Sequence, residues 1–214
     1  MGAFDLSGRT ALVTGASRGI GAATCAALAR AGADVIGVSS SLPEDGGELG
    51  AAVRATGRRF EGVACDLGDR AALRAMLDGL GARRIDILVN NAGIIRRSPA
   101  EAHDDADWDA VMAVNLDAPF LLTREIGRGM VARGAGKVVF VASVLSFQGG
   151  LTVPGYTAAK GGVAQLARAF ANEWAARGVN VNAVAPGYVA TENTAALQAD
   201  SAREAQILAR VPAG

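Results

Sequence analysis

Short apolar runs alternate with longer segments of helical periodicity along the whole chain. Apolar runs near residues 10–13, 34–39, 59–65, 85–89, 137–142 and 180–185 predict buried strands. The segments between them predict helices, one ending near residue 31 and others near 48–56, 70–80, 105–114, 119–133, 157–177 and 201–210. Because strands and helices alternate, we expect an α/β fold: a doubly wound parallel sheet in three α/β/α layers, forming a single domain over residues 1–214.

Polar residues and glycines stand where the expected strands end. They are Asp66, the segment 90–93, Ser143, and the pair Pro186 and Gly187. The carboxyl ends of parallel strands meet at one edge of a sheet, and ligands bind there at the point where the strand order reverses. We therefore expect these residues to converge on one binding site.

A glycine-rich loop, Thr-Gly-Ala-Ser-Arg-Gly-Ile-Gly, joins the first strand to the first helix at residues 14–21. Gly15, Gly19 and Gly21 would let the backbone turn tightly and approach a pyrophosphate, whose charge the helix N-terminus favours. The spacing Gly-x-x-x-Gly-x-Gly differs from the Gly-x-Gly-x-x-Gly of the usual dinucleotide fingerprint. Together with the strand before it and the helix after it, the loop predicts nucleotide binding.

The segment 141–160 carries a serine, a tyrosine and a lysine that fit proton transfer. Ser143 ends an expected strand, and Tyr156 and Lys160 would share one face of a helix because four residues separate them. A tyrosine works near neutral pH only if its pKa falls from about 10, and an ammonium group about 4 Å away would supply about 4 kcal/mol toward that fall. Alternatively, Tyr156 and Lys160 are an ordinary packing and solubility pair of an Ala-rich helix.

Composition excludes several classes of function. Lys plus Arg equals Asp plus Glu at 21 each, so neither a nucleic-acid-binding basic field nor an acidic tail is expected, and a small-molecule site is favoured. No apolar run approaches the roughly 20 residues of a membrane span, and no signal peptide is evident, so we expect a cytoplasmic protein without a membrane partner. Cys25 and Cys65 are expected as reduced core thiols, with no metal site, and His103, the single histidine, as a surface residue.

Taken together, the residues 14–21, 90–93, Asn115, Ser143, Tyr156, Lys160 and 186–187 resemble the classical short-chain dehydrogenase/reductase family. The likeness covers nearly the whole chain and implies a Rossmann-like fold and an oxidoreductase acting on CH–OH groups. It implies that Tyr156 is the general acid or base and that Ser143 polarises the reacting oxygen. It also implies that Lys160 binds the nicotinamide ribose and lowers the pKa of Tyr156, while Asn115 anchors a water that relays protons.

The resemblance also implies which residues hold the cofactor. The pyrophosphate would lie at the glycine loop, the adenine near Asp66, and the nicotinamide at the segment after the last strand. The alternatives are that Asp66 caps a turn, that Asn115 breaks a helix, and that Thr191 is an N-cap. The full set is Gly15, Ser17, Arg18, Gly19, Ile20, Gly21, Asp66, Leu67, Asn90, Ala92, Gly93, Tyr156, Lys160, Pro186, Gly187, Val189 and Thr191.

A closer likeness concerns the segments 93–97, 146–150 and 185–194. They resemble family members that act on sugar acids of the 2-deoxy-D-gluconate and 2-dehydro-3-deoxy-D-gluconate type. A sugar acid needs a cation for its carboxylate, so we expect Arg96 or Arg97 to bind that group, with Gln148 and the catalytic Ser143 and Tyr156 also at the substrate. The alternative is that the two arginines form a solvated surface pair.

Cofactor choice depends on the end of the second strand. Ser39, Ser40 and Ser41 stand where an Asp would bind the 2′-hydroxyl of NAD and repel a 2′-phosphate, and Arg18 could attract the phosphate of NADP. The sugar-acid resemblance favours NAD, with NADP as a possibility.

The end of the chain bears on assembly and on competing functions. The sequence stops at Gly214, where family members continue with a helix and a seventh strand, so we expect a truncated sheet with an open apolar edge at 180–185. Family members often assemble through that missing strand, and a homo-oligomer, tetramer or dimer, is expected. One competing function is an NADPH-dependent reductase of 3-oxoacyl thioesters or other ketones; another is an inactive, truncated nucleotide-binding protein.

Overall fold

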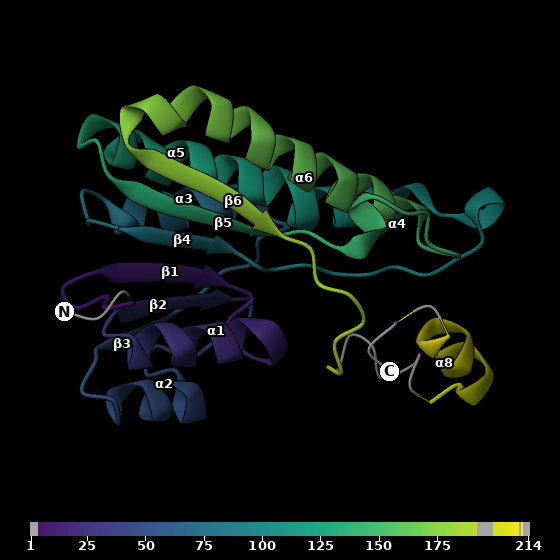
Figure 1. The fold of residues 1–214 in the computed structure, drawn as a ribbon, viewed down its shortest axis with the longest axis horizontal. Coiled ribbons are helices and arrows are strands. Elements are labelled where there is room, and N and C mark those ends of the chain that lie inside the picture. Colours follow the sequence, from purple (N-terminus) through teal and green to yellow (C-terminus); the bar gives the residue numbers. More distant parts are fainter. Residues whose placement is uncertain (1–3, 192–198, 210, 212–214) are drawn as a thin grey trace.

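Six parallel strands form one sheet in the computed structural model, which describes residues 4–191, 199–209 and 211. The order of the strands is β3-β2-β1-β4-β5-β6, so the direction of winding reverses between β1 and β4 (Figure 1). The predicted doubly wound parallel sheet is confirmed. The strands are β1 (Thr10–Thr14), β2 (Asp34–Ser39), β3 (Phe60–Ala64), β4 (Ile87–Asn90), β5 (Gly136–Val141) and β6 (Val179–Val184).

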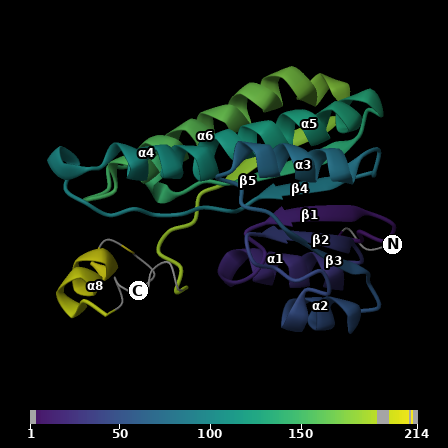
Figure 2. The ribbon, with the colours of Figure 1, turned by 180° about the vertical axis from the view of Figure 1, so that it is seen from behind.

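Helices cover both faces of the sheet. On one face, α1 (Gly19–Arg30) and α2 (Gly47–Arg54) pack over β1, β2 and β3. On the other face lie α3 (Arg70–Leu80), α5 (Ala118–Ala132) and α6 (Pro154–Trp174), as the two opposite views in Figures 1 and 2 show. The remaining helices are α4 (Asp105–Met112), α8 (Ser201–Leu208), a π-helical turn (Ala113–Asp117) and the 3₁₀ turns Ala100–Ala102, Val144–Ser146 and Ala175–Arg177.

The strands β1, β2 and β4 are buried almost throughout because helices cover both of their faces. Along β1, Leu12 belongs to the core under α3, α5 and α6, whereas Ala11 and Val13 belong to the core under α1 and α2. Phe140 of β5 is fully buried and packs in the first core together with Trp174. A strand that contributes to two cores reads as a continuous hydrophobic run, whereas the edge strand β6 begins with buried valines that alternate with exposed asparagines.

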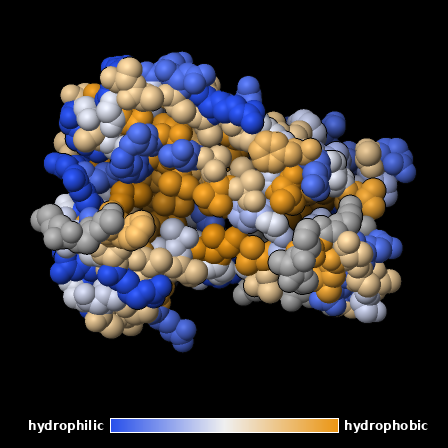
Figure 3. All heavy atoms as spheres, in the orientation of Figure 1, coloured by the Kyte–Doolittle hydropathy of each residue, from blue (hydrophilic) through white to orange (hydrophobic). Residues whose placement is uncertain are grey.

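One part of the sheet has a less covered face. β6 lies at the edge of the sheet, and Val184 at its end is 56% exposed. Val139 and Val141 of β5 are only partly buried on the side of α1 and α2. Figure 3 shows hydrophobic side chains at the surface in this area, between α6 and the helices α1 and α2. Within the described ranges no helix is long and apolar enough to cross a membrane.

Candidate active site

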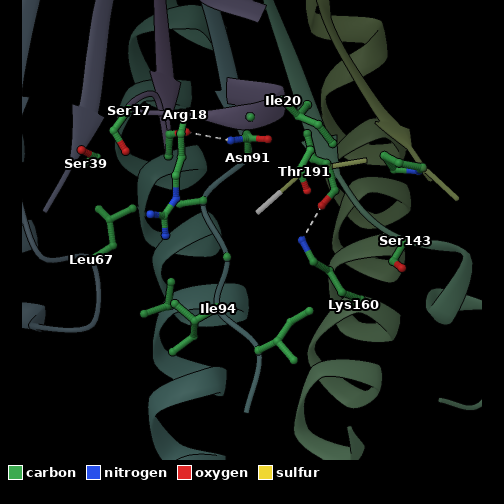
Figure 4. Close-up of a pocket in the computed structure, with 18 of the residues that line it drawn as sticks. Ser17, Arg18, Ile20, Ser39, Leu67, Asn91, Ile94, Ser143, Lys160 and Thr191 are labelled. Carbon is green, nitrogen blue, oxygen red and sulfur yellow. Dashed lines mark hydrogen bonds between the residues drawn. The ribbon is translucent and has the colours of Figure 1, made fainter. Parts of the chain in front are cut away.

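A pocket with a volume of about 310 Å³ runs along the carboxyl ends of the strands, centred on the switch between β1 and β4 (Figure 4). Every strand end contributes to it, and α6 adds Tyr156 and Lys160. Predicted cofactor residues that line it are Gly15, Ser17, Arg18, Gly19, Ile20, Asp66, Leu67, Ala92, Gly93, Tyr156, Lys160, Pro186, Gly187, Val189 and Thr191. Ser143 lines it as well. The expected convergence of these residues is therefore present in the fold.

The glycine loop makes a turn that side chains would block. Gly15 has a φ of +64°, and a Cβ atom there would lie 2.9 Å from the Cα of Ala92. Gly21 faces inward rather than into the pocket, and a Cβ atom on it would lie 2.0 Å from the carbonyl oxygen of Gly15. The loop therefore needs glycine at both positions to bring its backbone against the β4 segment and the start of α1. The result is an open backbone cradle at a helix N-terminus, which fits a pyrophosphate.

Thr14 and Asn91 hold this cradle at the switch point. The Thr14 hydroxyl accepts the backbone N–H groups of Asn91 and Ala92, each at 3.0 Å. The Asn91 amide donates to the carbonyl oxygens of Thr14 at 2.9 Å and Gly15 at 3.2 Å. Asn91 also lines the pocket, and the sequence analysis missed it as an individual residue, although the doubled asparagine of the segment 90–93 was the available signal.

Asn90 has a different place. It is buried, does not line the pocket, and donates from its side-chain amide to the hydroxyl of Thr123 on α5 at 2.9 Å. Asn90 therefore ties the central strand β4 to α5, while its neighbour Asn91 shapes the pocket.

Asn115 lies in a π-helical turn that joins α4 to α5 without a break. The sequence predicted two separate helices, but a widened turn lets the chain stay helical while it turns the Asn115 side chain inward. This side chain is fully buried; it accepts the N–H of Ile94 at 2.8 Å and donates to the carbonyl oxygen of Ile94 at 2.9 Å. Asn115 thus fixes the segment after β4 behind the pocket wall rather than lining the pocket.

Ser143, Tyr156 and Lys160 meet at the pocket. The helix α6 begins at Pro154, three residues earlier than predicted, so Tyr156 lies in its first turn. Tyr156 and Ser143 are hydrogen bonded, and the Lys160 Nζ atom lies 5.7 Å from the centre of the Tyr156 ring. Lys160 is buried and donates to the carbonyl oxygen of Val141 at 2.6 Å.

Burial governs the protonation of this pair. It raises the pKa of Tyr156, although the hydrogen bond with Ser143 and the positive charge of Arg97 act to lower it. Burial also lowers the pKa of Lys160 to about 8. The expectation that Lys160 alone brings the pKa of Tyr156 down is wrong for this structure, because the ammonium group is itself desolvated and is directed at Val141.

A second pocket of about 510 Å³ adjoins the first at Ser143 and Tyr156. Arg97 and Gln148 line it, as predicted for substrate contacts. Arg96 does not line it and instead forms an ion pair with Asp107 at 3.1 Å. The two neighbouring arginines are thereby separated: one faces the pocket and the other braces α4. Polar residues that the sequence analysis missed here are Tyr188 and Gln206, the latter on α8.

The end of β2 forms the far wall of the first pocket. Ser39 and Ser40 line it, and the buried Ser39 hydroxyl has no hydrogen-bond partner among the residues that the structure describes. Figure 4 shows the Arg18 side chain extending into the pocket on the side of Ser39 and Leu67, across from Lys160 and Ser143. Asp66 at the same end accepts the N–H of Gly68 at 2.9 Å, so it both lines the pocket and closes a turn.

Two further sequence expectations are resolved by the fold. His103 is half-buried rather than a surface residue; its Nδ1 atom lies 2.6 Å from the Ser98 hydroxyl, and its Nε2 atom is inaccessible. Cys25 and Cys65 are buried free thiols, and Cys65 also lines the first pocket. No cluster of three or more His, Cys, Asp or Glu residues that could hold a metal ion occurs within the described part of the chain.

Comparisons with known proteins agree with this geometry. A family model described as short chain dehydrogenase matches residues 9–202. A 2-dehydro-3-deoxy-D-gluconate 5-dehydrogenase of Pseudoalteromonas atlantica is 56% identical over 213 residues, which cover 99% of this chain and 84% of that protein. The 3-oxoacyl-[acyl-carrier-protein] reductase of Escherichia coli is 38% identical over 213 residues, covering 99% and 85%.

A solved structure from Beutenbergia cavernae superposes with a TM-score of 0.93 at 50% sequence identity, covering 99% of this chain and 84% of that one. It is described as an NAD(P)-dependent gluconate 5-dehydrogenase with NADP bound at low occupancy.

Proposed function

This chain belongs to the short-chain dehydrogenase family, and from that premise we propose that it is an NAD(P)-dependent oxidoreductase of sugar acids. It would interconvert a secondary alcohol and a ketone on a substrate of the 2-dehydro-3-deoxy-D-gluconate or 2-deoxy-D-gluconate type. The observation that carries the proposal is the junction of the two pockets at Ser143 and Tyr156, with a cofactor-sized cradle on one side and Arg97 on the other.

Tyr156 and Ser143 would handle the reacting oxygen. The Ser143 hydroxyl oxygen accepts the N–H of Leu145 at 3.1 Å, which leaves its own proton available for a substrate oxygen. Tyr156 would then give or take the proton on that oxygen, since it lies within hydrogen-bonding reach of Ser143. Lys160 would hold the nicotinamide ribose through its buried Nζ atom, and the positive charge of Arg97 would favour the phenolate in the step that removes a proton.

The first pocket fits a nicotinamide dinucleotide. Its support is the backbone cradle, which forms only because Gly15 and Gly21 carry no Cβ atom to clash with Ala92 and the Gly15 carbonyl oxygen, and the buried Ser39 hydroxyl at the opposite end, which lacks a partner among the described residues. When bound, the cofactor accepts or donates the hydride. Gly19 and Ile20 would face the pyrophosphate, and Asp66 and Leu67 would face the adenine. The nicotinamide would be contacted by Pro186, Gly187, Val189 and Thr191. Asn115 would not touch the cofactor but would fix the backbone of Ile94, which lines the pocket.

The pocket supports use of NADP as well as the NAD favoured by the sequence. Neither Ser39 nor Ser40 carries the negative charge that would repel a 2′-phosphate, and Arg18 extends toward the same wall. The Beutenbergia cavernae relative is described with NADP. We propose that the enzyme accepts both cofactors, so NAD preference over NADP stays a prediction for direct measurement.

Arg97 would bind the carboxylate of the substrate. It lines the second pocket, and its positive charge lowers the pKa of Tyr156, so the two groups act on one space. Arg96 is engaged by Asp107 and would have a structural role. Gln148 would contact substrate hydroxyls from the loop before α6. This arrangement favours a small anionic substrate over the acyl thioester of the competing reductase function, for which the pocket's arginine has no evident use.

The assembly of the whole protein is a further proposal. We propose a homo-oligomer, supported by the exposed apolar edge at Val184 and the exposed aromatic residues Trp108 and Phe120 on neighbouring helices. Size-exclusion chromatography with light scattering measures this directly. The competing function of an inactive nucleotide binder predicts thermal stabilisation by the cofactor without turnover.

The test is initial-rate absorbance at 340 nm with 2-dehydro-3-deoxy-D-gluconate and 2-deoxy-D-gluconate, with NAD and NADP in separate runs. Tyr156→Phe should abolish turnover while cofactor binding by fluorescence titration persists. Arg97→Ala should raise KM for these acids about tenfold or more, because it leaves the carboxylate without its charged partner. Arg96→Ala is the matched control and should change KM little; equal effects of the two substitutions would remove the carboxylate assignment.

A further inference from the structure

The 3₁₀ turn Val144–Ser146 that follows β5 joins the site's catalytic groups through one hydroxyl that has no assigned role. The Ser146 Oγ atom accepts the backbone N–H of Ser143 at 3.2 Å. The same atom donates to the carbonyl oxygen of Lys160 at 2.7 Å. Both hydrogen-bonding capacities of the hydroxyl are used, and both lead to the backbone of a residue placed in the catalytic set.

This hydroxyl completes a reciprocal cap. Ser143 begins the turn, and its Oγ atom accepts the N–H of Leu145. In the other direction, the Ser146 Oγ atom accepts the N–H of Ser143. In such a capping box each serine fixes the other's backbone. Ser146 therefore helps to hold the backbone from which the Ser143 side chain projects toward the pocket.

The second bond ties this turn to α6. Lys160 also links the two elements through its side chain, since Nζ donates to the carbonyl oxygen of Val141. In the proposed function, Lys160 Nζ would also bind the cofactor ribose, so the geometry of that side-chain link would depend on the cofactor. The bond from Ser146 to the Lys160 carbonyl oxygen involves only backbone on the α6 side, so it persists when the lysine side chain moves.

We propose that Ser146 is a positioning residue that fixes Ser143 relative to Tyr156 and Lys160 during turnover. Ser146 lines neither of the two pockets. Its effect is expected on the rate of the chemical step rather than on binding, because misplacement of a reacting group by a fraction of an ångström costs rate steeply. The inference rests on the proposed function for its kinetic consequence, but the bond to Ser143 is testable without it.

The experiment compares Ser146→Ala with Ser146→Thr, which restores a hydroxyl. Thr56→Ala is the matched control, because the Thr56 hydroxyl donates to the carbonyl oxygen of Val53 at 2.7 Å, in the same kind of bond far from the site. Each variant is assayed for kcat and KM with 2-dehydro-3-deoxy-D-gluconate and the preferred cofactor. Amide hydrogen exchange at Ser143 is measured in parallel by NMR on the ¹⁵N-labelled full chain.

Ser146→Ala is expected to lower kcat about tenfold or more, with KM and cofactor Kd within about twofold, and to speed exchange of the Ser143 amide about tenfold. Ser146→Thr should recover part of both, and Thr56→Ala should change neither. An unchanged kcat with unchanged Ser143 exchange, or a loss of kcat that Thr56→Ala reproduces, would overturn the inference. If the wild type turns over none of these substrates, the proposed function fails, and the exchange at Ser143 alone decides: faster exchange in Ser146→Ala supports the link, and unchanged exchange refutes it.

Discussion

Replacing Lys160 by Met should remove activity and yet stabilise the cofactor-free protein near neutral pH. Burial lowers the pKa of Lys160 from 10.5 to about 8. Below pH 8 the folded protein therefore holds a desolvated ammonium group that the unfolded chain exposes to water. At 1.36 kcal/mol for each tenfold change in the proton equilibrium, the cost to folding is about 3 kcal/mol.

The sign of the pH dependence follows from proton counts. Between the folded pKa and the unfolded pKa the unfolded state binds more protons, so wild-type stability gains as pH rises from 8 to 10.5. The cost should fall from about 3 kcal/mol at pH 6.5 to about 1 kcal/mol at pH 9.5. Met has no charge to desolvate, so the advantage of Lys160→Met should shrink by about 2 kcal/mol over this interval.

Urea unfolding of both proteins at pH 6.5 and pH 9.5, without cofactor, measures this difference. The change in the difference with pH is more informative than its absolute size, because losing the bond to the Val141 carbonyl oxygen also costs about 1–3 kcal/mol. Lys137→Met is the matched control, since Lys137 is the other lysine of the chain and is exposed. A stability difference for Lys160→Met that stays constant from pH 6.5 to 9.5 would refute the reasoning.

Three further substitutions, one of them with a matched control, test the fold that supports the site. Gly21→Ala should lose cofactor binding and lower the free energy of unfolding by more than 1 kcal/mol, because the new Cβ atom would lie 2.0 Å from the Gly15 carbonyl oxygen. The matched control is Gly79→Ala on α3, which has open space around it and should stabilise the protein by up to about 1 kcal/mol. Fluorescence titration measures cofactor binding of both variants, and urea unfolding measures their stability. Asp86→Asn should destabilise the protein more at pH 7 than at pH 3. Contacts with Arg84, the Thr10 N–H and Arg9 lower the pKa of Asp86 by more than burial raises it, so the stabilisation is fully present above the unfolded pKa of 3.8 and declines as pH falls from there through the lower folded value; equal loss at both pH values would contradict this. Phe140→Ala should lower the free energy of unfolding by about 3–5 kcal/mol, because it leaves a cavity beneath α6. A fall in melting temperature of less than a few degrees would contradict this and show that neighbouring side chains had filled the cavity.

Local sequence signals were sufficient wherever a residue's role depends on its neighbours in the chain. The inner strands β1, β2 and β4 were predicted because they are buried almost throughout and are therefore continuous apolar runs, whereas the edge strand β6 alternates buried valines with exposed asparagines at its start. The glycine loop was predicted because Gly15 and Gly21 meet the steric requirements of one short turn. Parallel alternation then placed the strand ends at one edge, so most of the residues that line the first pocket could be named before their positions were known.

Tertiary structure decided what depends on contacts between distant segments. Arg96 and Arg97 are indistinguishable in sequence, and only the position of Asp107 assigns one to an ion pair and the other to the substrate pocket. The sequence predicted that Lys160 would lower the pKa of Tyr156, but burial, which no local pattern specifies, desolvates both groups and raises the pKa of Tyr156. Ser146 carried no motif of its own, because its bond to Lys160 joins residues 14 positions apart that meet only when α6 packs against the end of β5. Composition and periodicity determine which elements form, and the low-dielectric packing of those elements determines which charges and hydroxyls act together.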